Sequence, residues 1–187
     1  MIEAASILPE LSGSIQHLST ESFRRRACRL RLVITDNDGV LTDTGVYYGP
    51  EGELVKRYSI RDGMGMERLR MLGVETAIVT GEQSLNLKRR AEKLKLGYLY
   101  LGVKDKAAVL ARIRQDTGWT NEEIAYIGDD VNDLGIMDIV GESGLTAAPA
   151  DAMPQVRAVA QYLCAWRGGH GAFRDFAEAI ITLRMQQ

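Results

Sequence analysis

The sequence predicts an α/β domain built on a doubly wound parallel sheet, and three features support this fold class. Short apolar runs alternate along the chain with longer segments whose apolar residues recur at helical spacing. The runs lack a polar face, as strands do when helices cover both sides of a sheet. The length of 187 residues is sufficient for one domain with a substantial core. Strands that alternate with helices in this way favour a parallel sheet between two helical layers.

The first half of this domain predicts a strand, a hairpin, a helix and a second strand. Residues 30–35 (LRLVIT) form an apolar run typical of a buried parallel strand. Residues 45–58 predict a β-hairpin, because strand-forming residues flank a Gly-Pro-Glu-Gly turn. Residues 62–72 predict a helix that Gly73 ends, and residues 74–80 (VETAIVT) predict the second core strand.

The second half continues the alternation of helices and strands. The predicted elements are a helix at 84–95, a strand at 98–102, a helix at 104–116, a strand at 124–128, a helix from about 132, a strand at 144–148, a candidate sixth strand at 158–164 and an amphipathic helix at 172–185. From 74 to 148, each predicted strand is separated from the next by a helical segment, which suits parallel crossover connections.

Residues 1–28 differ in composition from the rest of the chain. They are rich in serine and end in the triplet Arg24-Arg25-Arg26. We interpret the triplet as a solvated helix face rather than a site for an anionic partner, because nucleic-acid patches usually need a longer basic run. We expect residues 1–28 to be a flexible N-terminal extension and residues 29–187 to form the folded domain.

Composition and charge exclude several classes of function. A net charge of -2 gives no basic surface for nucleic acid. No apolar run approaches the roughly 20 residues that span a bilayer. The first residues carry Glu3 and Glu10 and no basic leader, unlike a secretory signal. Cys28 and Cys164 lack metal-ligand spacing and suit a reducing compartment. We therefore expect a cytoplasmic protein that binds neither nucleic acid nor membrane.

Residues suited to phosphate chemistry follow the predicted strands. In sheets of this kind, ligands bind beyond the carboxyl ends of the strands. The residues expected at that edge are Asp36, Asp38, Thr80, Lys106, Asp129, Asp130 and Asp133. Carboxylates crowded together repel one another, so this set needs a cation. An all-oxygen donor set favours Mg²⁺ over zinc.

The residue types at this edge point to phosphoryl transfer. Magnesium held by one or two carboxylates usually acts on phosphate groups. Lys106 supplies a positive charge for phosphate oxygens, and Thr80 with the amides that follow it supplies donors. One aspartate can attack phosphorus and form an aspartyl-phosphate. A second acid can then protonate the leaving alcohol and later activate water. Asp36 and Asp38 are the candidates for these two tasks.

Four motifs in this order resemble the haloacid dehalogenase (HAD) superfamily of phosphatases. They are D-x-D-G-V-x-T-D from Asp36, Thr80-Gly81, the later Lys106, and G-D-D-x-x-D from Gly128. The resemblance implies a Rossmann-like doubly wound sheet, the HAD fold. It assigns the nucleophile to Asp36, the general acid/base to Asp38 and the phosphoryl group's contacts to Thr80 and Lys106. It also assigns Mg²⁺ to Asp36, the carbonyl oxygen of Asp38 and Asp129, with Asp130 and Asp133 as supporting acids.

Longer stretches resemble a small capless branch of that superfamily. Between Asp43 and Thr80 there is little room for a cap domain, and the hairpin is the insertion present. GVYYGPEGELVKRYSIRDGMG, RRAEKL, YLYLGVKDK, AYIGDDVND and RGGHGAFR are similar to 3-deoxy-D-manno-octulosonate (KDO) 8-phosphate phosphatases and to KDN 9-phosphate phosphatases. The resemblance implies a sugar-acid phosphate substrate, a protruding hairpin, a homotetramer, and a tail at Arg167–Arg174 that can reach a neighbour's active site.

The same resemblance implies substrate contacts, and two of these positions depart from the octulosonate pattern. The implied contacts are Ser59, Ile60, Arg61, Asp62, Gly63, Glu67, Glu82 and Arg90. Octulosonate phosphatases tend to carry Arg where Glu67 and Glu82 stand, and Glu after Thr-Gly is the nine-carbon pattern. Arginine suits a sugar carboxylate, whereas glutamate repels it or accepts hydroxyl groups.

Three functions remain open from the sequence. KDO 8-phosphate hydrolysis comes first, and hydrolysis of KDN 9-phosphate or of another sugar-acid phosphate is the alternative. A non-catalytic oligomerisation domain is an alternative of another class, and it predicts decay of the motifs, which are intact here. Asn37 stands where relatives usually hold an apolar residue, and its amide requires a hydrogen-bond partner.

Overall fold

A mostly parallel sheet forms the centre of the computed structural model, which describes residues 11–185. The strands of this sheet are β1 (Ser14–Ile15), β2 (Leu32–Thr35), β5 (Glu75–Val79), β6 (Tyr98–Tyr100), β7 (Ile124–Ile127), β8 (Leu145–Ala148) and β9 (Tyr162–Leu163). Across the described residues their order is β1-β9-β8-β7-β2-β5-β6. All neighbours pair in parallel except β1, which runs antiparallel to β9 at one edge.

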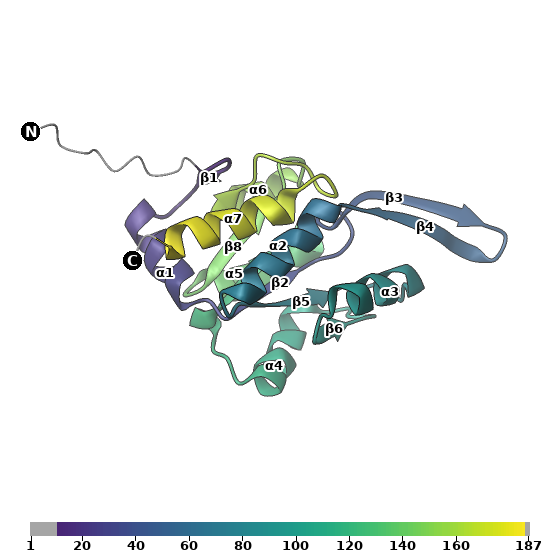
Figure 1. The fold of residues 1–187 in the computed structure, drawn as a ribbon, viewed down its shortest axis with the longest axis horizontal. Coiled ribbons are helices and arrows are strands. Elements are labelled where there is room, and N and C mark those ends of the chain that lie inside the picture. Colours follow the sequence, from purple (N-terminus) through teal and green to yellow (C-terminus); the bar gives the residue numbers. More distant parts are fainter. Residues whose placement is uncertain (1–10, 186–187) are drawn as a thin grey trace, which may run out of the picture.

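Helices cover both faces of this sheet (Figure 1). They are α1 (Thr20–Arg29), α2 (Ile60–Met71), α3 (Leu85–Leu94), α4 (Lys106–Thr117), α5 (Leu134–Gly141), α6 (Pro154–Val159) and α7 (Ala172–Arg184). Side chains of α1, α2, α3 and α7 pack in one apolar cluster, and those of α4, α5 and α6 pack in another. The predicted doubly wound α/β architecture is therefore confirmed. None of the helices in the described part of the chain is both long and apolar enough to cross a bilayer.

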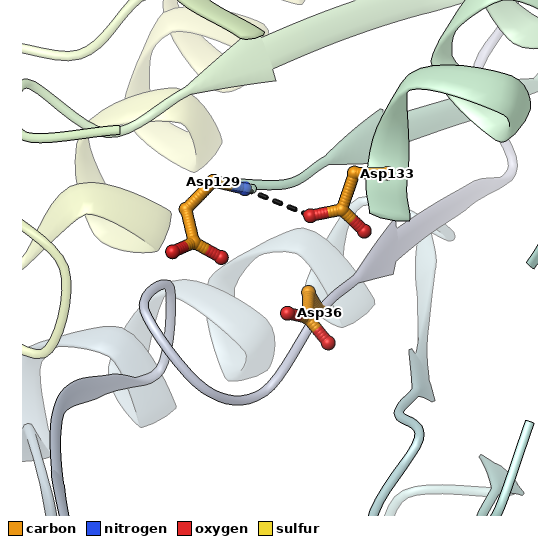
Figure 2. A group of neighbouring side chains, drawn as sticks. All are labelled: Asp36, Asp129 and Asp133. Atoms are coloured by element: carbon orange, nitrogen blue, oxygen red, sulfur yellow. Dashed lines mark hydrogen bonds between the residues drawn. The ribbon is translucent and has the colours of Figure 1, made fainter. Parts of the chain in front are cut away.

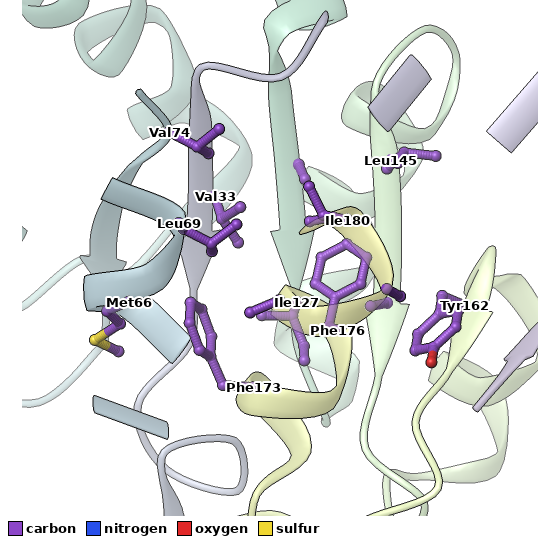
Figure 3. Close-up of a cluster of buried hydrophobic side chains, with 14 of the residues drawn as sticks. Val33, Met66, Leu69, Val74, Ile127, Leu145, Tyr162, Phe173, Phe176 and Ile180 are labelled. Carbon is purple, nitrogen blue, oxygen red and sulfur yellow. The ribbon is translucent and has the colours of Figure 1, made fainter. Parts of the chain in front are cut away.

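Strand β2 explains why the sequence carries an apolar run instead of an alternating pattern. Val33 faces the cluster formed with α2 and α7, while Leu32 and Ile34 face the cluster formed with α4 and α5. Figure 3 shows Phe173 and Phe176 of α7 beside Val33 in the first of these clusters. A strand buried on both faces needs apolar residues at every position, and this holds β2 and the residues after it at a fixed place.

A separate hairpin projects from one end of the sheet (Figure 1). Its strands are β3 (Thr42–Gly49) and β4 (Gly52–Tyr58), which pair antiparallel. Gly52 at the turn has φ +110°, a conformation that favours glycine. The described residues between β4 and Thr80 contain α2 and β5 and no cap domain, as predicted.

Two segments differ from the sequence-based expectations. The run predicted as a strand at 158–164 is divided between α6 (Pro154–Val159) and the short β9. A proline in the first turn of a helix removes no hydrogen bond, and Pro154 marks such a start. The sequence pattern of this region is apolar in both halves, so periodicity alone did not separate helix from strand.

The second difference is the N-terminal segment, where residues 14–28 belong to the fold. Ser19 caps α1 by accepting a hydrogen bond from the Ser22 amide, and Phe23 is fully buried. Arg26, from the arginine triplet, donates to the carbonyl oxygens of Gly141 and Gly144 at 2.8 Å. The expected flexible extension thus overlaps α1. Its residues 1–10 lie outside the described residues.

Candidate active site

The predicted catalytic residues meet at the carboxyl ends of three neighbouring strands. Asp36 follows β2, Thr80 follows β5 and Asp129 comes two residues after β7. These strands pair directly, so their ends lie side by side. Lys106 begins α4, and its Nζ lies 2.9 Å from Oδ1 of Asp36. The sheet order therefore brings together residues that are far apart in the sequence.

Asp36, Asp129 and Asp133 lie close together (Figure 2). One carboxylate oxygen from each lies within 4.8 Å of the others. Asp133 is already saturated by protein donors: Lys106 lies 2.6 Å from Oδ1, and the Asp129 amide donates to Oδ2 at 2.9 Å. Tyr126 also donates to Asp133 Oδ1. Asp133 therefore positions Lys106 and the loop after β7, and Asp36 and Asp129 are left to hold a cation.

The unpaired oxygens at this point fit a magnesium ion. Oδ1 of Asp129 is buried and has no hydrogen-bond partner among the described residues. A buried carboxylate oxygen without a donor is costly, and a hard cation satisfies it. Burial together with the Asp133 charge raises the pKa of Asp36, and burial together with the Asp36 charge raises that of Asp129. Burial and neighbouring negative charge both disfavour the ionised carboxylates, and a bound divalent cation would offset both effects.

Gly39 packs against the Asp129 carboxylate, and the sequence analysis did not single it out. Its φ is +94°, and a Cβ built on it would lie 1.9 Å from Oδ2 of Asp129. Any side chain here would displace the Asp129 carboxylate from its position against the backbone of the first motif. The one signal in the sequence was the Asp-Gly pair after β2, which indicates a turn. That signal does not indicate which residue the glycine contacts.

Asp38 is held by donors on both of its oxygens. Oδ1 accepts hydrogen bonds from Thr42 Oγ1 at 3.2 Å and from Asn37 Nδ2 at 3.0 Å. Oδ2 lies 2.8 Å from Nζ of Lys56, which comes from β4 of the hairpin. The Nδ2 group of Asn37 thus finds a partner within the motif itself, whereas its buried Oδ1 has no hydrogen-bond partner among the described residues. Sequence reasoning missed Lys56, because its partner lies in a different element and no spacing rule connects the two.

A cavity of about 360 Å³ opens over these residues. The catalytic side contributes Asp36, Asp38, Thr80, Glu82, Asp129 and Asp130, and the hairpin contributes Thr44, Val46, Tyr48, Glu53 and Lys56. The hairpin therefore forms one wall of the cavity. Thr80 is buried, and its hydroxyl oxygen accepts from the Glu82 amide, which leaves the hydroxyl proton free to donate.

Most of the predicted substrate contacts lie outside this cavity. Arg90 donates to the Ser59 carbonyl oxygen at 3.0 Å and lies over the Tyr58 ring. Asp62 is 2% exposed and accepts from the Arg174 amide at the start of α7. These residues line a separate cavity of about 10 Å³, which Gly63 also lines. Of the predicted contacts, Glu82 is the one that the structure places in the main cavity, and the assignments of the others stay predictions.

The remaining predicted contacts and the predicted tail are placed as follows. Ile60 is 82% exposed on α2, Glu67 is exposed on the same helix, and Arg61 lies against Trp166. In the tail, the Gly169 amide donates to the Val40 carbonyl oxygen at 2.9 Å. The Gly-rich part of the tail thus packs on the first-motif loop of its own chain. Its expected reach into a neighbour's site remains untested.

The sheet, the motif order and this carboxylate site define a phosphatase of the HAD superfamily. Curated relatives agree: KDO 8-phosphate phosphatases KdsC from Yersinia pestis and Haemophilus influenzae are each 36% identical to this chain. The alignments cover 84% and 81% of this chain and 82% and 83% of those proteins. The chain belongs to the KDO 8-phosphate phosphatase (KdsC) family. No family model matches the chain.

Solved structures give the same result. A KDO 8-phosphate phosphatase from Moraxella catarrhalis, in complex with magnesium, phosphate and KDO, is 31% identical with a TM-score of 0.82. That match covers 90% of this chain and 95% of the other. The cobalt-bound Haemophilus influenzae enzyme is 33% identical with a TM-score of 0.81, over 86% and 92% of the two chains. The predicted HAD fold is confirmed.

Proposed function

We propose that the chain is a Mg²⁺-dependent phosphatase that hydrolyses KDO 8-phosphate to KDO and inorganic phosphate. The observation that carries this proposal is the arrangement around Asp36. Asp36 forms an ion pair with Lys106 and lies close to Asp129, and the two aspartates both line the cavity. The ligands in the Moraxella catarrhalis structure support the assignment, because that relative binds magnesium, phosphate and KDO together. The intact catalytic set argues against a non-catalytic oligomerisation domain.

In the first step a carboxylate oxygen of Asp36 attacks phosphorus, and the bond from phosphorus to the sugar oxygen breaks. Asp38 gives its proton to that oxygen, so the sugar leaves as a neutral alcohol. Lys106, 2.9 Å from Asp36, holds the nucleophile and offsets negative charge at the phosphoryl group. Thr80 donates a hydrogen bond from its hydroxyl group to a phosphoryl oxygen. Asp36 and Asp129 would hold Mg²⁺, which supplies further charge neutralisation for the phosphoryl group.

In the second step Asp38, now a carboxylate, takes a proton from a water molecule. The water oxygen attacks the aspartyl-phosphate, the bond from phosphorus to Asp36 breaks, and phosphate leaves. The enzyme returns to its starting form without a net gain or loss of protons at Asp36 and Asp38. Thr42 and Asn37 hold one oxygen of Asp38 in both steps.

A direct comparison of substrates tests the proposal. Purified protein is supplied with KDO 8-phosphate, a nine-carbon ulosonate 9-phosphate and simple hexose phosphates, and released phosphate is measured. We expect the highest kcat/KM for the eight-carbon ester. A preference for the nine-carbon ester would transfer the assignment to the alternative, and a preference for hexose phosphates would refute both.

The nine-carbon alternative is supported by Glu82. This residue lines the cavity after Thr80-Gly81, and no arginine lines that cavity among the described residues. A glutamate at the mouth favours sugar hydroxyl groups over a sugar carboxylate. The family relatives favour the eight-carbon ester and this residue favours the nine-carbon one, so the assay above decides between them.

We also propose a homotetramer in the cytoplasm. The hairpin exposes Tyr47, Tyr48, Leu54 and Val55, which is more apolar surface than an isolated projecting hairpin needs. Light scattering after gel filtration measures the mass, and we expect four times 20.7 kDa. Cys28 and Cys164 are free thiols, as suits a reducing compartment.

A further inference from the structure

Lys56 is a buried cation that touches the proposed proton shuttle. Its Nζ lies 2.8 Å from Oδ2 of Asp38 and 3.3 Å from Oε2 of Glu53, and its side chain is 2% exposed. Lys56 is the one cation in ion-pair contact with Asp38 within residues 11–185. A buried ammonium group between two carboxylates has few other conformations to adopt, so it fixes the direction of both.

Glu53 ties this lysine to the main body of the domain. It accepts hydrogen bonds from Ser84 Oγ at 2.6 Å and from Asn86 Nδ2 at 2.9 Å, both at the start of α3. The hairpin is thereby fastened to α3 through Glu53 and to the first motif through Lys56. The contacts form a continuous path from α3 to Asp38, and every member of the path is buried or half-buried.

The two oxygens of Asp38 depend on different parts of the chain. Oδ1 is held by Asn37 and Thr42, which belong to the loop that carries Asp38 itself. Within residues 11–185, Oδ2 is held by Lys56 alone, from the hairpin. The rotation of the carboxyl group, and hence which oxygen faces the cavity, is therefore set by where the hairpin sits.

We propose that Lys56 is a positioning residue for Asp38, so that the hairpin controls proton delivery to the leaving oxygen. This inference rests on the proposed phosphatase function. A role for Lys56 as a direct phosphate ligand is disfavoured, because its ammonium group is already shared by two carboxylates and is almost fully buried. Lys56 acts on the first step through Asp38, and it leaves the attack by Asp36 unchanged.

The test uses the dependence of the first step on the leaving group. An alkyl phosphate needs a proton on its departing oxygen, whereas p-nitrophenyl phosphate releases a stable anion without one. Release of the alcohol or phenol is measured in a single turnover with enzyme in excess, for Lys56→Met and the wild type. The alkyl ester is the sugar phosphate that the wild type hydrolyses fastest, so the assay does not depend on the eight-carbon assignment.

We expect Lys56→Met to slow the release of the alcohol from the alkyl ester on the order of tenfold to a hundredfold. A loss of that size lies within the range for general acid catalysis. We expect p-nitrophenyl phosphate to change by less than about threefold, because proton delivery contributes little to its first step. Lys56→Arg keeps the buried charge. Its turnover of the alkyl ester should therefore fall less than that of Lys56→Met, and p-nitrophenyl phosphate should again be affected little. If Lys56→Met fails to fold, the selective loss in Lys56→Arg carries the test.

Arg57→Met is the matched control. Arg57 is the next residue on β4, but its side chain is half exposed and pairs with Asp43 rather than Asp38. This variant should leave the ratio between the two esters unchanged. An equal loss on both esters in Lys56→Met, or no loss on either, would overturn the proposal. A wild type that hydrolyses neither ester would instead overturn the proposed function, so the two failures are distinguishable.

Discussion

The base of the active-site cavity and its hairpin wall are built in different ways. At the base, Asp36 and Lys106 are buried and held by sheet strands and a helix that pack on the core. In the wall, the outer half of the hairpin exposes Tyr48 and Leu54 and has no strand beyond its own pair among the described residues. We therefore expect the base to act on every ester, whereas the wall, through Lys56 and its exposed residues, should affect individual esters differently. Variants of the base should therefore affect every substrate, and variants of the wall should affect some substrates more than others.

The largest effect is expected at the base from Asp36→Asn. The variant lacks the nucleophile, so kcat should fall on the order of 10⁴-fold or more for every phosphate ester. Burial raises the pKa of Asp36, so a neutral side chain removes an unfavourable charge and Tm should hold or rise. Steady-state kinetics and thermal melts measure the two. Residual activity near the wild-type level would remove Asp36 from the mechanism.

Removal of the metal is the second test of the base. Treatment with a chelator, followed by desalting, should abolish hydrolysis of all substrates, and added Mg²⁺ should restore it. The reason is that Asp36 and Asp129 repel each other without a cation between them. Magnesium titration of the stripped protein provides the measurement. Undiminished turnover by protein shown to be metal-free would contradict the assignment.

Glu82→Arg tests whether a residue of the cavity can change the choice of ester without stopping the reaction, because Glu82 lines the cavity and is exposed. An arginine there can pair with the sugar carboxylate, so the ratio of eight-carbon to nine-carbon turnover should rise several-fold, about 1 kcal/mol. Parallel kcat/KM measurements on both esters give the ratio. The same ratio in variant and wild type would exclude Glu82 from substrate selection.

The smallest effect on turnover is expected outside both regions, at Asp62. Burial raises the pKa of this carboxyl group to about 6, so ionisation destabilises the fold. The penalty is absent below the unfolded pKa of about 4 and develops as the pH rises through 6. Asp62→Asn keeps an acceptor for the Arg174 amide. It should be about 1–2 kcal/mol more stable than the wild type at pH 8 and equally stable at pH 3.5, by denaturant unfolding.

Asp62→Asn also tests a sequence-based assignment. If Asp62 contacts substrate, KM should rise in this variant. If it only joins α2 to α7, kinetics at the main cavity should be unchanged. The same test applies to Arg90 on α3, which is also a predicted substrate contact and donates to the Ser59 carbonyl oxygen.

The sequence was informative wherever a residue acts through its own motif. Asp36, Thr80, Lys106 and Asp129 stand at strand ends or helix starts, and the rule for parallel sheets was enough to bring them together. Asn37 was recognised as a polar residue in need of a partner, and the structure supplies Asp38 for its Nδ2 group, while its Oδ1 has no partner among the described residues. These cases depend on local order along the chain, which is visible without coordinates.

The sequence was uninformative where function depends on contact between distant elements. Lys56 reaches Asp38 only because the hairpin folds back over the first motif. Arg90 donates to the Ser59 carbonyl oxygen, a contact between α3 and the residue before α2 that no spacing in the sequence indicates, and its substrate role stays a prediction. In the N-terminal segment, Phe23 and Arg26 bind α1 to the domain through side chains that a serine-rich composition did not reveal.

Gly39 and Gly168 carry no functional group, yet there is no space for a side chain on either. A Cβ on Gly39 would meet the Asp129 carboxylate, and one on Gly168 would lie 1.9 Å from the Gly39 carbonyl oxygen. In a saturation-mutagenesis map, both positions should therefore reject even alanine and rank with Asp36. A survey that identified chemistry from intolerance alone would count two glycines among the catalytic residues.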